Sequence, residues 1–437
     1  RSIDGNDALM PRRFDDRGIT SADIRIQSYS GAACPPPGGN RRLKRPGKGV
    51  SGMDSASDIA MLGIGTAVPR WRLDQADTSL RLAEALRDNP AAARWARRVF
   101  RQQGIESRHT CEPNLLEKAG ACRYFPLGRE AAPATAERMA VYRREALPLA
   151  LLAAERALED SGTPPEAVTH LITASCTGQY LPGLDAELVR ALGLPERVNR
   201  LPLTFVGCAA GLKAVGLARQ FAAVSRDAKV RALVVCVELC TLHIQPSDDW
   251  EDLFAASLFG DGASACVVGR PDEEAAAVFG LGEPGSVLLP GGEADMTWDI
   301  GNHGFELVLS ANVPKRIREY LPAEIGSFMP KGRAPELWAI HPGGRGIIDA
   351  VEEICGLTPE QTRPSREVLR RYGNMSSASI LFVMRELLRE LGDRPDGSGP
   401  VEGLAVAFGP GLTAELLPFT FAPAPVSGES GRVAVHA

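Results

Sequence analysis

Cys208 is the residue of this chain best placed for covalent chemistry. It lies in the segment VGCAAG, directly before an amphipathic pattern that includes Leu212, Val215, Leu217 and Phe221. The pattern predicts a helix whose first turn carries the cysteine, where free N–H groups and the positive end of the helix dipole favour a nucleophilic thiolate. Most free cysteines are small buried core residues, so a nucleophile needs a partner base elsewhere in the chain.

Two polar residues late in the chain are candidates for that partnership. His341 follows the apolar run 337–340 and opens the turn HPGG, which predicts an imidazole at the end of a buried strand, where functional sites collect. Asn374 lies in YGNMSSA, at a glycine turn predicted to open a helix over 378–391, and its amide can donate a hydrogen bond to a substrate oxygen. A single histidine is more often structural than catalytic, so the three residues carry weight only together.

Composition limits the classes of function that remain. With 437 residues and 44% hydrophobic content, the chain can bury one large core or two closely packed halves. A net charge of −5 indicates neither a nucleic-acid surface nor a polybasic membrane patch, so an anionic substrate would need a local basic site. The nine cysteines form no CxxC pair, which predicts no metal site and no disulfide framework. Reduced thiols, together with the lack of a membrane-length apolar run, favour a cytoplasmic location.

The chain divides into four predicted segments. Residues 1–52 are rich in Arg, Gly, Pro and Ser, a composition that cannot bury enough apolar surface to fold, so we predict a disordered leader. An N-terminal half over 53–275 carries the cysteine, a C-terminal half over 276–423 carries the histidine and the asparagine, and 424–437 is a flexible tail. Both halves repeat the order strand, site residue, helix. This order predicts two similar α/β halves that pack through their helices, with the site between them.

Five ordered motifs connect the chain with a known family. VGCAAG, LFGDGASA, WAIHPGG, YGNMSSA and AFGPGLT closely resemble, in order and separation, motifs of the type III polyketide synthases, the chalcone-synthase-like branch of the thiolase superfamily. The resemblance covers roughly residues 59–421. It implies an α/β fold, the thiolase-like αβαβα layered sandwich built of two similar halves. It also implies a catalytic triad at Cys208, His341 and Asn374.

The resemblance implies a specific reaction. An acyl-CoA starter is transferred to Cys208, whose thiolate His341 stabilises as an ion pair. Malonyl-CoA then loses CO₂, and donors on His341 and Asn374 stabilise the enolate, which attacks the thioester on the cysteine. Repetition builds a polyketide that closes by aldol condensation or lactonisation. Both CoA thioesters are substrates, no bound cofactor is expected, and the family is homodimeric.

Further positions are carried over one by one. Phe259 in LFGDG matches an aromatic gate between the CoA tunnel and the cavity, and Phe305 matches a second gate. Arg98 matches a basic position at the tunnel mouth that meets CoA phosphates, although Trp95 and Gln102 replace two lysines of the family. The remaining substrate-binding candidates are Cys176, Thr177, Leu181, Cys240, His243, Gly343 and Gly344. Each also has a plainer explanation as core or cavity lining, and Leu181 is expected either at the dimer interface or in the core.

The starter is the least determined feature. Bacterial members that make alkylpyrones or alkylresorcinols often show the pair Thr177 and Cys240, so we expect an apolar tunnel and a medium- or long-chain fatty acyl-CoA starter. His243 and Ile244 are larger than an open tunnel needs, which leaves a chalcone- or stilbene-like synthase with a short or aromatic starter as an alternative. A ketoacyl-ACP synthase III would typically show HQAN and NTS motifs instead. An inactive scaffold would not need all three reactive residues.

Overall fold

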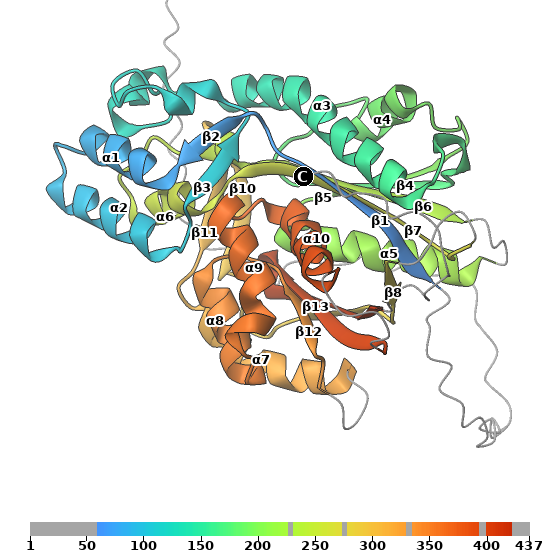
Figure 1. Cartoon of the computed structure of the whole chain (residues 1–437). Helices are drawn as coiled ribbons and strands as arrows, with labels where there is room; N and C mark the ends of the chain where they lie inside the picture. Colours follow the sequence, from blue (N-terminus) through green and yellow to red (C-terminus); the bar gives the residue numbers. More distant parts are fainter. Residues whose placement is uncertain (1–58, 226–229, 273–277, 329–333, 393–398, 422–437) are drawn as a thin grey trace, which may run out of the picture. The chain divides into compact units, whose positions relative to one another are not determined.

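The sequence folds around one extended sheet (Figure 1). The computed structural model describes residues 59–225, 230–272, 278–328, 334–392 and 399–421. The predicted leader (1–52), the predicted tail (424–437) and the predicted boundary between the halves (275/276) lie outside the described residues. The described ranges belong to a single compact unit.

The strands of the N-terminal half form one end of this sheet, in the order β5-β4-β6-β7-β1. The strands are β1 (Ala60–Ala67), β4 (His170–Ser175), β5 (Asn199–Thr204), β6 (Arg231–Leu239) and β7 (Asp261–Gly269). β4 pairs in parallel with β5 and β6, whereas β7 is antiparallel to β6 and β1. Every residue of β6 and β7 is buried, as expected for apolar strands covered on both faces.

The C-terminal half supplies the other end of the sheet. Here β12 (Leu337–Ile340) is parallel to β13 (Val401–Gly409), which is antiparallel to β14 (Thr413–Phe421). The short strand β8 (Phe279–Leu281) pairs with both β14 and β1. The hydrogen-bonded ladder therefore runs from one half into the other, and β9 (Gly285–Leu288) adds to β14.

Helices cover both faces of the two strand groups and fill the space between them (Figure 1). α3 (Thr135–Ser161) and α4 (Leu184–Leu192) pack on the outer face of the N-terminal strands. α5 (Ala210–Val224) and α10 (Ser379–Leu391) lie between the halves, where both contribute to one core cluster. The outer layer beside the C-terminal strands consists of α7 (Val313–Phe328), α8 (Arg345–Cys355) and α9 (Pro359–Tyr372). This arrangement confirms the predicted αβαβα sandwich.

The central helices approach each other very closely at Gly211 of α5. A Cβ atom added there would lie 2.1 Å from the carbonyl oxygen of Ser377. Only glycine leaves room for this backbone contact, which joins the start of α5 to the turn before α10. The predicted helix 378–391 is confirmed, with η6 (Ser376–Ala378) as a 3₁₀ turn leading into α10.

Smaller elements surround the end of the sheet where the motifs gather. The strand pair β2–β3 joins α1, α2 and α6 there, and a separate two-stranded hairpin is formed by β10 and β11. Their bounds are β2 (Trp71–Asp74), β3 (Ser107–Thr110), α1 (Gln75–Ala85), α2 (Pro90–Gln102), α6 (Trp250–Leu258), β10 (Met296–Gly301) and β11 (Gly304–Leu309). Within the described ranges, none of the helices combines the length and the apolar character that a membrane crossing requires.

Candidate active site

Cys208 lies on the 3₁₀ turn η4 (Gly207–Ala209), which continues directly into α5, so the predicted position in a first helical turn is confirmed. Gly207 has a φ of +68°, and a Cβ atom there would lie 2.2 Å from Cδ of Pro410. Glycine is therefore required both by the backbone conformation and by the close approach. The turn places the thiol at the wall of a cavity, where it is partly exposed.

Asn374 is the residue whose side chain meets this thiol. Its Nδ2 lies 3.8 Å and its Oδ1 3.9 Å from Sγ of Cys208. Oδ1 also accepts the N–H of Ser376 at 2.8 Å, which fixes the amide. The backbone of Asn374 forms a parallel bridge with Phe259, because Gly260 N–H donates to the Asn374 carbonyl at 3.0 Å. The structure thus brings together the predicted nucleophile, the predicted amide and the predicted gate.

His341 directly follows β12 and is almost completely enclosed, with 1% of its surface exposed. Its backbone N–H donates to Val406 of β13 at 2.8 Å, but within the described residues neither ring nitrogen has a hydrogen-bond partner. Buried polar atoms are nearly always partnered, so two free nitrogens mark a ring available to a ligand. No hydrogen bond joins it to Cys208 here. Both residues nevertheless lie near the same ends of two neighbouring parallel strands. His341 follows β12, and β13 ends at Gly409, which packs against Ala209 of η4, next to Cys208.

Burial dominates the electrostatics of this pair. It raises the pKa of the Cys208 thiol to about 11, although hydrogen bonds from Ser376 and Asn374 act in the opposite direction. Burial also lowers the pKa of the His341 imidazole to about 3. Each charge is thus disfavoured by itself, and a thiolate is favourable only together with an imidazolium beside it. The ion pair expected from the sequence stays a prediction.

The cavity at Cys208 has a volume of about 90 Å³ and mostly apolar walls. Four predicted residues line it: Cys176, Thr177, Cys240 and Phe259. Six further side chains, which were not predicted from the sequence as site residues, also line it: Phe205, Met296, Trp298, Leu307, Ser376 and Pro410. Trp298 is held in place because its Nε1–H donates to the Cys176 carbonyl at 2.8 Å. No motif marks the β10–β11 hairpin, so the sequence offered no signal for Trp298 or Leu307.

A buried carboxyl group beneath the cavity was also missed. Glu238 of β6 accepts the Thr177 hydroxyl at 2.8 Å and the Cys176 N–H at 3.1 Å. The hydroxyl of Ser377, in η6, also donates to it. Burial raises the pKa of the carboxyl despite these donors. A glutamate inside the otherwise apolar run of β6 is a signal that the sequence contained, because an unpaired buried charge is costly.

His243 and Phe305, both predicted from the sequence, face a smaller neighbouring pocket of about 20 Å³ instead of the main cavity. Nε2 of His243 donates to the Thr177 carbonyl at 2.7 Å, and its Nδ1 accepts the N–H of Phe305 at 2.9 Å. The rings of His243 and Phe305 stack with centroids 4.3 Å apart. Since both nitrogens of this histidine are occupied and burial lowers its pKa to about 3, it is a neutral anchor for the hairpin. Leu307, which lies on β11 together with Phe305, lines the main cavity.

The remaining predicted residues lie around this centre. Gly343 adjoins the His341 ring, since a Cβ atom there would lie 3.3 Å from its Cδ2, and Gly344 precedes α8. Leu181 is 90% exposed and therefore not a core residue. Arg98 lies on the exposed face of α2.

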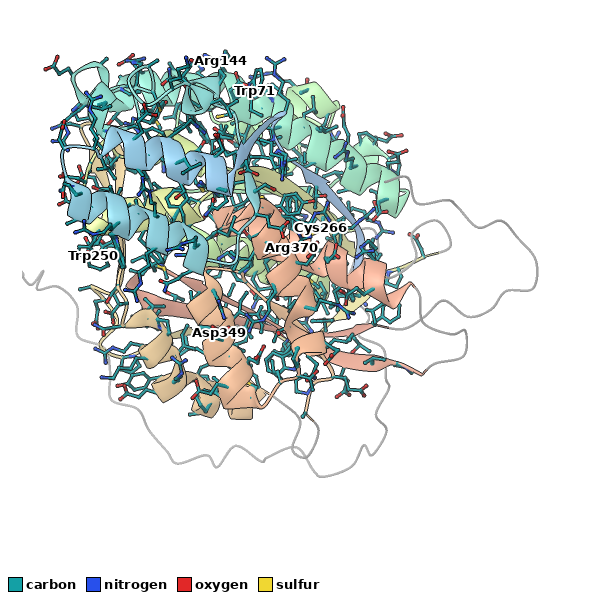
Figure 2. All side chains as sticks on the ribbon, turned by 60° about the vertical axis from the view of Figure 1, so that its left-hand side comes forward. Trp71, Arg144, Trp250, Cys266, Asp349 and Arg370 are labelled. Carbon is teal, nitrogen blue, oxygen red and sulfur yellow. The ribbon has the colours of Figure 1, made fainter. Side chains whose placement is uncertain are left out.

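Trp95 attaches α2 to α6, because its Nε1–H donates to the carbonyl of Trp250 (labelled in Figure 2) at 3.4 Å. No group of three or more metal-ligating side chains occurs in the described part of the chain. The cysteines described are all free thiols.

Comparison with known proteins gives consistent matches over most of the chain. The N-terminal domain of chalcone and stilbene synthases matches residues 49–272, and their C-terminal domain matches residues 284–420. The alpha-pyrone synthesis polyketide synthase-like protein Pks18 of Mycobacterium tuberculosis (strain H37Rv) is 33% identical over 367 residues, which are 81% of this chain and 88% of that protein.

Solved structures match over a similar span. The C-terminal type III polyketide synthase domain of Steely1 from Dictyostelium is 28% identical with a TM-score of 0.76, covering 84% of this chain and 99% of that one. PKS-I from the brown alga Ectocarpus siliculosus is 26% identical with a TM-score of 0.75, covering 85% of this chain and 100% of that one.

We predict that His341→Gln slows alkylation of Cys208 by iodoacetamide at neutral pH by about tenfold or more. Without an imidazole to take its proton, the thiol titrates near the value of about 11 that burial sets. Peptide mass spectrometry over a series of pH values gives the rate. Cys355, a half-buried thiol whose pKa burial also raises to about 11, is the internal control and keeps its rate. Identical Cys208 profiles in both proteins would show that the thiolate does not depend on His341.

Proposed function

Because the chain belongs to the chalcone and stilbene synthase family and is a type III polyketide synthase, an acyltransferase, we propose that it loads an acyl group from acyl-CoA onto Cys208 and extends it with malonyl-CoA. One observation carries this proposal. The Cys208 thiol and the Asn374 amide, from different halves of the chain, lie 3.8 Å apart at the wall of a mostly apolar cavity. A nucleophile beside a fixed hydrogen-bond donor is what acyl transfer followed by enolate formation requires.

The proposed reaction has two stages. In the first, Sγ of Cys208 attacks the thioester carbon of the starter and its proton passes to His341. His341 then gives this proton to the sulfur of coenzyme A, which leaves as the thiol. In the second, the C–CO₂ bond of malonyl-CoA breaks, and its electron pair becomes an enolate whose oxygen accepts hydrogen bonds from Asn374 Nδ2–H and from an N–H of His341. The enolate carbon then attacks the Cys208 thioester, which frees the thiolate. The carboxylate supplies the electrons, so no bound cofactor is required.

Coenzyme A is proposed to meet the basic face of α2. Arg94, Arg97, Arg98 and Arg101 are all exposed along this helix. Their positive charges would attract the phosphates of the nucleotide on a chain whose net charge is −5. We assign the direct phosphate contact to Arg98, the position that matches the family.

For the starter we propose an aliphatic acyl-CoA, with closure of the product to a pyrone. Thr177 and Cys240 line the cavity together with Met296 and Leu307, an apolar wall that suits an alkyl chain. The cavity volume of about 90 Å³ is nevertheless smaller than the roughly 150 Å³ that holds a benzene molecule in an engineered protein cavity. A medium- or long-chain starter, and an alkylpyrone or alkylresorcinol product, therefore require part of this wall to move, and we assign that movement to Trp298, one of the large side chains of the wall.

A second candidate is a carrier-protein-dependent synthase, which would use the same three residues. It would extend the acyl group once and only with acyl carrier protein. Incubation with labelled malonyl-CoA and acyl-CoA, without carrier protein, separates the two functions. Repeated extension supports the proposed function, and a requirement for carrier protein contradicts it. The cytoplasm, where CoA thioesters are available and thiols stay reduced, is the proposed location.

We predict that Cys208→Ala abolishes acylation of the protein, whereas Asn374→Ala is still acylated but releases CO₂ from malonyl-CoA about a hundredfold more slowly. Only the second stage develops the enolate charge that the amide stabilises. Mass spectrometry of the intact protein measures acylation, and labelled CO₂ measures decarboxylation. Cys355→Ala, which changes a thiol on α8 outside the cavity, is the matched control. An Asn374→Ala protein that decarboxylates malonyl-CoA at the normal rate would remove this role from Asn374.

A further prediction concerns the length of the acyl chain of the starter. Trp298→Ala should shift the preferred starter towards acyl chains of about eight carbons or more, because each additional buried methylene contributes up to about 0.8 kcal/mol. Trp298→Phe keeps most of the wall and should keep the preference of the wild type. Cys240→Phe, combined with Trp298→Ala, should remove the gain while sparing acetyl- and butyryl-CoA. Product lengths are read by mass spectrometry. Equal chain-length profiles in all four proteins would show that this wall does not select the starter.

We also propose that the protein is a homodimer. Leu181 exposes 90% of its surface, and an exposed leucine at the family's dimer position suits an isologous contact. Leu181→Asp should convert dimers into monomers at micromolar concentration, as measured by light scattering. Leu80→Asp, at a leucine of α1 that is 63% exposed, is the control and leaves the mass unchanged. A wild-type protein that is monomeric and active would contradict the proposal.

A further inference from the structure

Arg108 of β3 is a fully buried cation that the reaction described above does not use. Its Nη1 donates to the carbonyls of Ala256 and Phe259, both at 2.7 Å, and its Nε donates to Oε1 of Gln75 at 3.0 Å. Within the described residues no carboxylate lies at ion-pair distance, and Nη2 has no hydrogen-bond partner. Burial lowers its pKa only to about 10, so the guanidinium remains charged at neutral pH.

The two carbonyl acceptors of this cation lie at the carboxyl end of α6. The last carbonyls of a helix accept no hydrogen bond from within the helix. They also form the negative end of the helix dipole, which favours a nearby cation. Gln75 completes the arrangement because its Nε2 donates to the Ser257 carbonyl at 2.8 Å. Arg108 and Gln75 thus act as a cap, supplied by other elements, that determines where α6 ends and where Phe259 begins.

The same arginine also lies against the backbone that leads to Asn374. A Cβ atom added at Gly260 would lie 3.2 Å from Cβ of Arg108, and one added at Gly373 would lie 2.8 Å from its Cγ. These two glycines flank the bridge between Phe259 and Asn374. The methylene groups of Arg108 therefore support both sides of that bridge.

Residues next to Arg108 hold the preceding part of the same segment. The Glu106 N–H donates to the carbonyl of Arg370 (labelled in Figure 2) at 2.8 Å, near the end of α9. The Ser107 hydroxyl donates to the carbonyl of Arg371 at 3.0 Å. The start of β3 is consequently tied to the chain on the N-terminal side of Asn374, and Arg108 continues this contact to the bridge itself.

We propose that Arg108 is a positioning residue that fixes the gate Phe259 and the amide of Asn374 as one unit against Cys208. The effect of Arg108 on catalysis rests on the proposed function. Its effect on the distance between the Asn374 amide and the Cys208 thiol does not. Lysine at this position would keep a charge but has no planar fork, so it cannot bind both carbonyls and Gln75 in the same geometry.

The test measures the pH dependence of Cys208 alkylation by iodoacetamide in the full-length protein. Because the Asn374 amide stabilises the thiolate, displacing it moves the profile to higher pH. In Arg108→Lys we expect alkylation at pH 8 to fall about fivefold, in the same direction as in Asn374→Ala. Malonyl-CoA decarboxylation should lose about tenfold in kcat with little change in KM, because an interaction of the transition state is weakened.

Arg138→Lys is the matched control. Arg138 is also fully buried and also donates to carbonyls, those of Pro133, Leu242 and Ile244, but it does not touch the bridge. The melting temperature of this variant should fall as it does in Arg108→Lys, but the pH profile of Cys208 alkylation should stay unchanged. If Arg108→Lys does not fold, Gln75→Leu, which removes one partner and keeps the charge, should show a smaller shift in the same direction.

The outcomes separate the inference from the function on which it rests. An unchanged Cys208 profile in the folded variant, or an equal shift in Arg138→Lys, overturns the role of Arg108. A wild-type protein that releases no CO₂ from malonyl-CoA contradicts the proposed function, whereas the alkylation profiles still decide whether Arg108 positions Asn374.

Discussion

The distance between Cys208 and Asn374 depends on how closely two helices from different halves of the chain can pack. Cys208 precedes α5 and Asn374 precedes α10, and Gly211 at the start of α5 contacts the backbone of Ser377 in the turn η6 that leads into α10. A methyl group at this point would separate them, since the contact leaves no room for a Cβ atom. The sheet, the capping of α6 and the bridge at Phe259 all serve to keep these two helix starts in register.

Burial has opposite effects on binding and on charge at this site. An apolar cavity suits an acyl chain and excludes water, but it raises the pKa of Cys208 and lowers that of His341. Charges can therefore form there only in pairs or under the hydrogen bonds of fixed donors. This explains why the amide of Asn374 is held by Ser376 and why the ring nitrogens of His341 have no hydrogen-bond partner in the described part of the chain.

The sequence was informative where chemistry and local conformation coincide. Cys208, Asn374 and Phe259 lie in glycine-bearing turns, whose small residues and flanking apolar runs are visible in a single sequence, and the layered fold followed from the same motifs. Trp298 and Leu307 lie in a hairpin without such marks, and their places in the cavity depend on contacts with residues far away in the chain. Arg108 was invisible for a similar reason, because a buried arginine looks like a surface arginine until its acceptors are known.

The β10–β11 hairpin is a two-stranded sheet of its own, outside the hydrogen-bonded ladder of the main sheet. It supplies Met296, Trp298 and Leu307 to the cavity but none of the three proposed catalytic residues. This wall can therefore be changed separately: the β10–β11 hairpin can be replaced by one with other side chains, while α5 and α10, which follow Cys208 and Asn374, stay as they are. Product diversity can then arise by replacing one short insert, and a chimera of this segment is a smaller engineering step than redesigning the core.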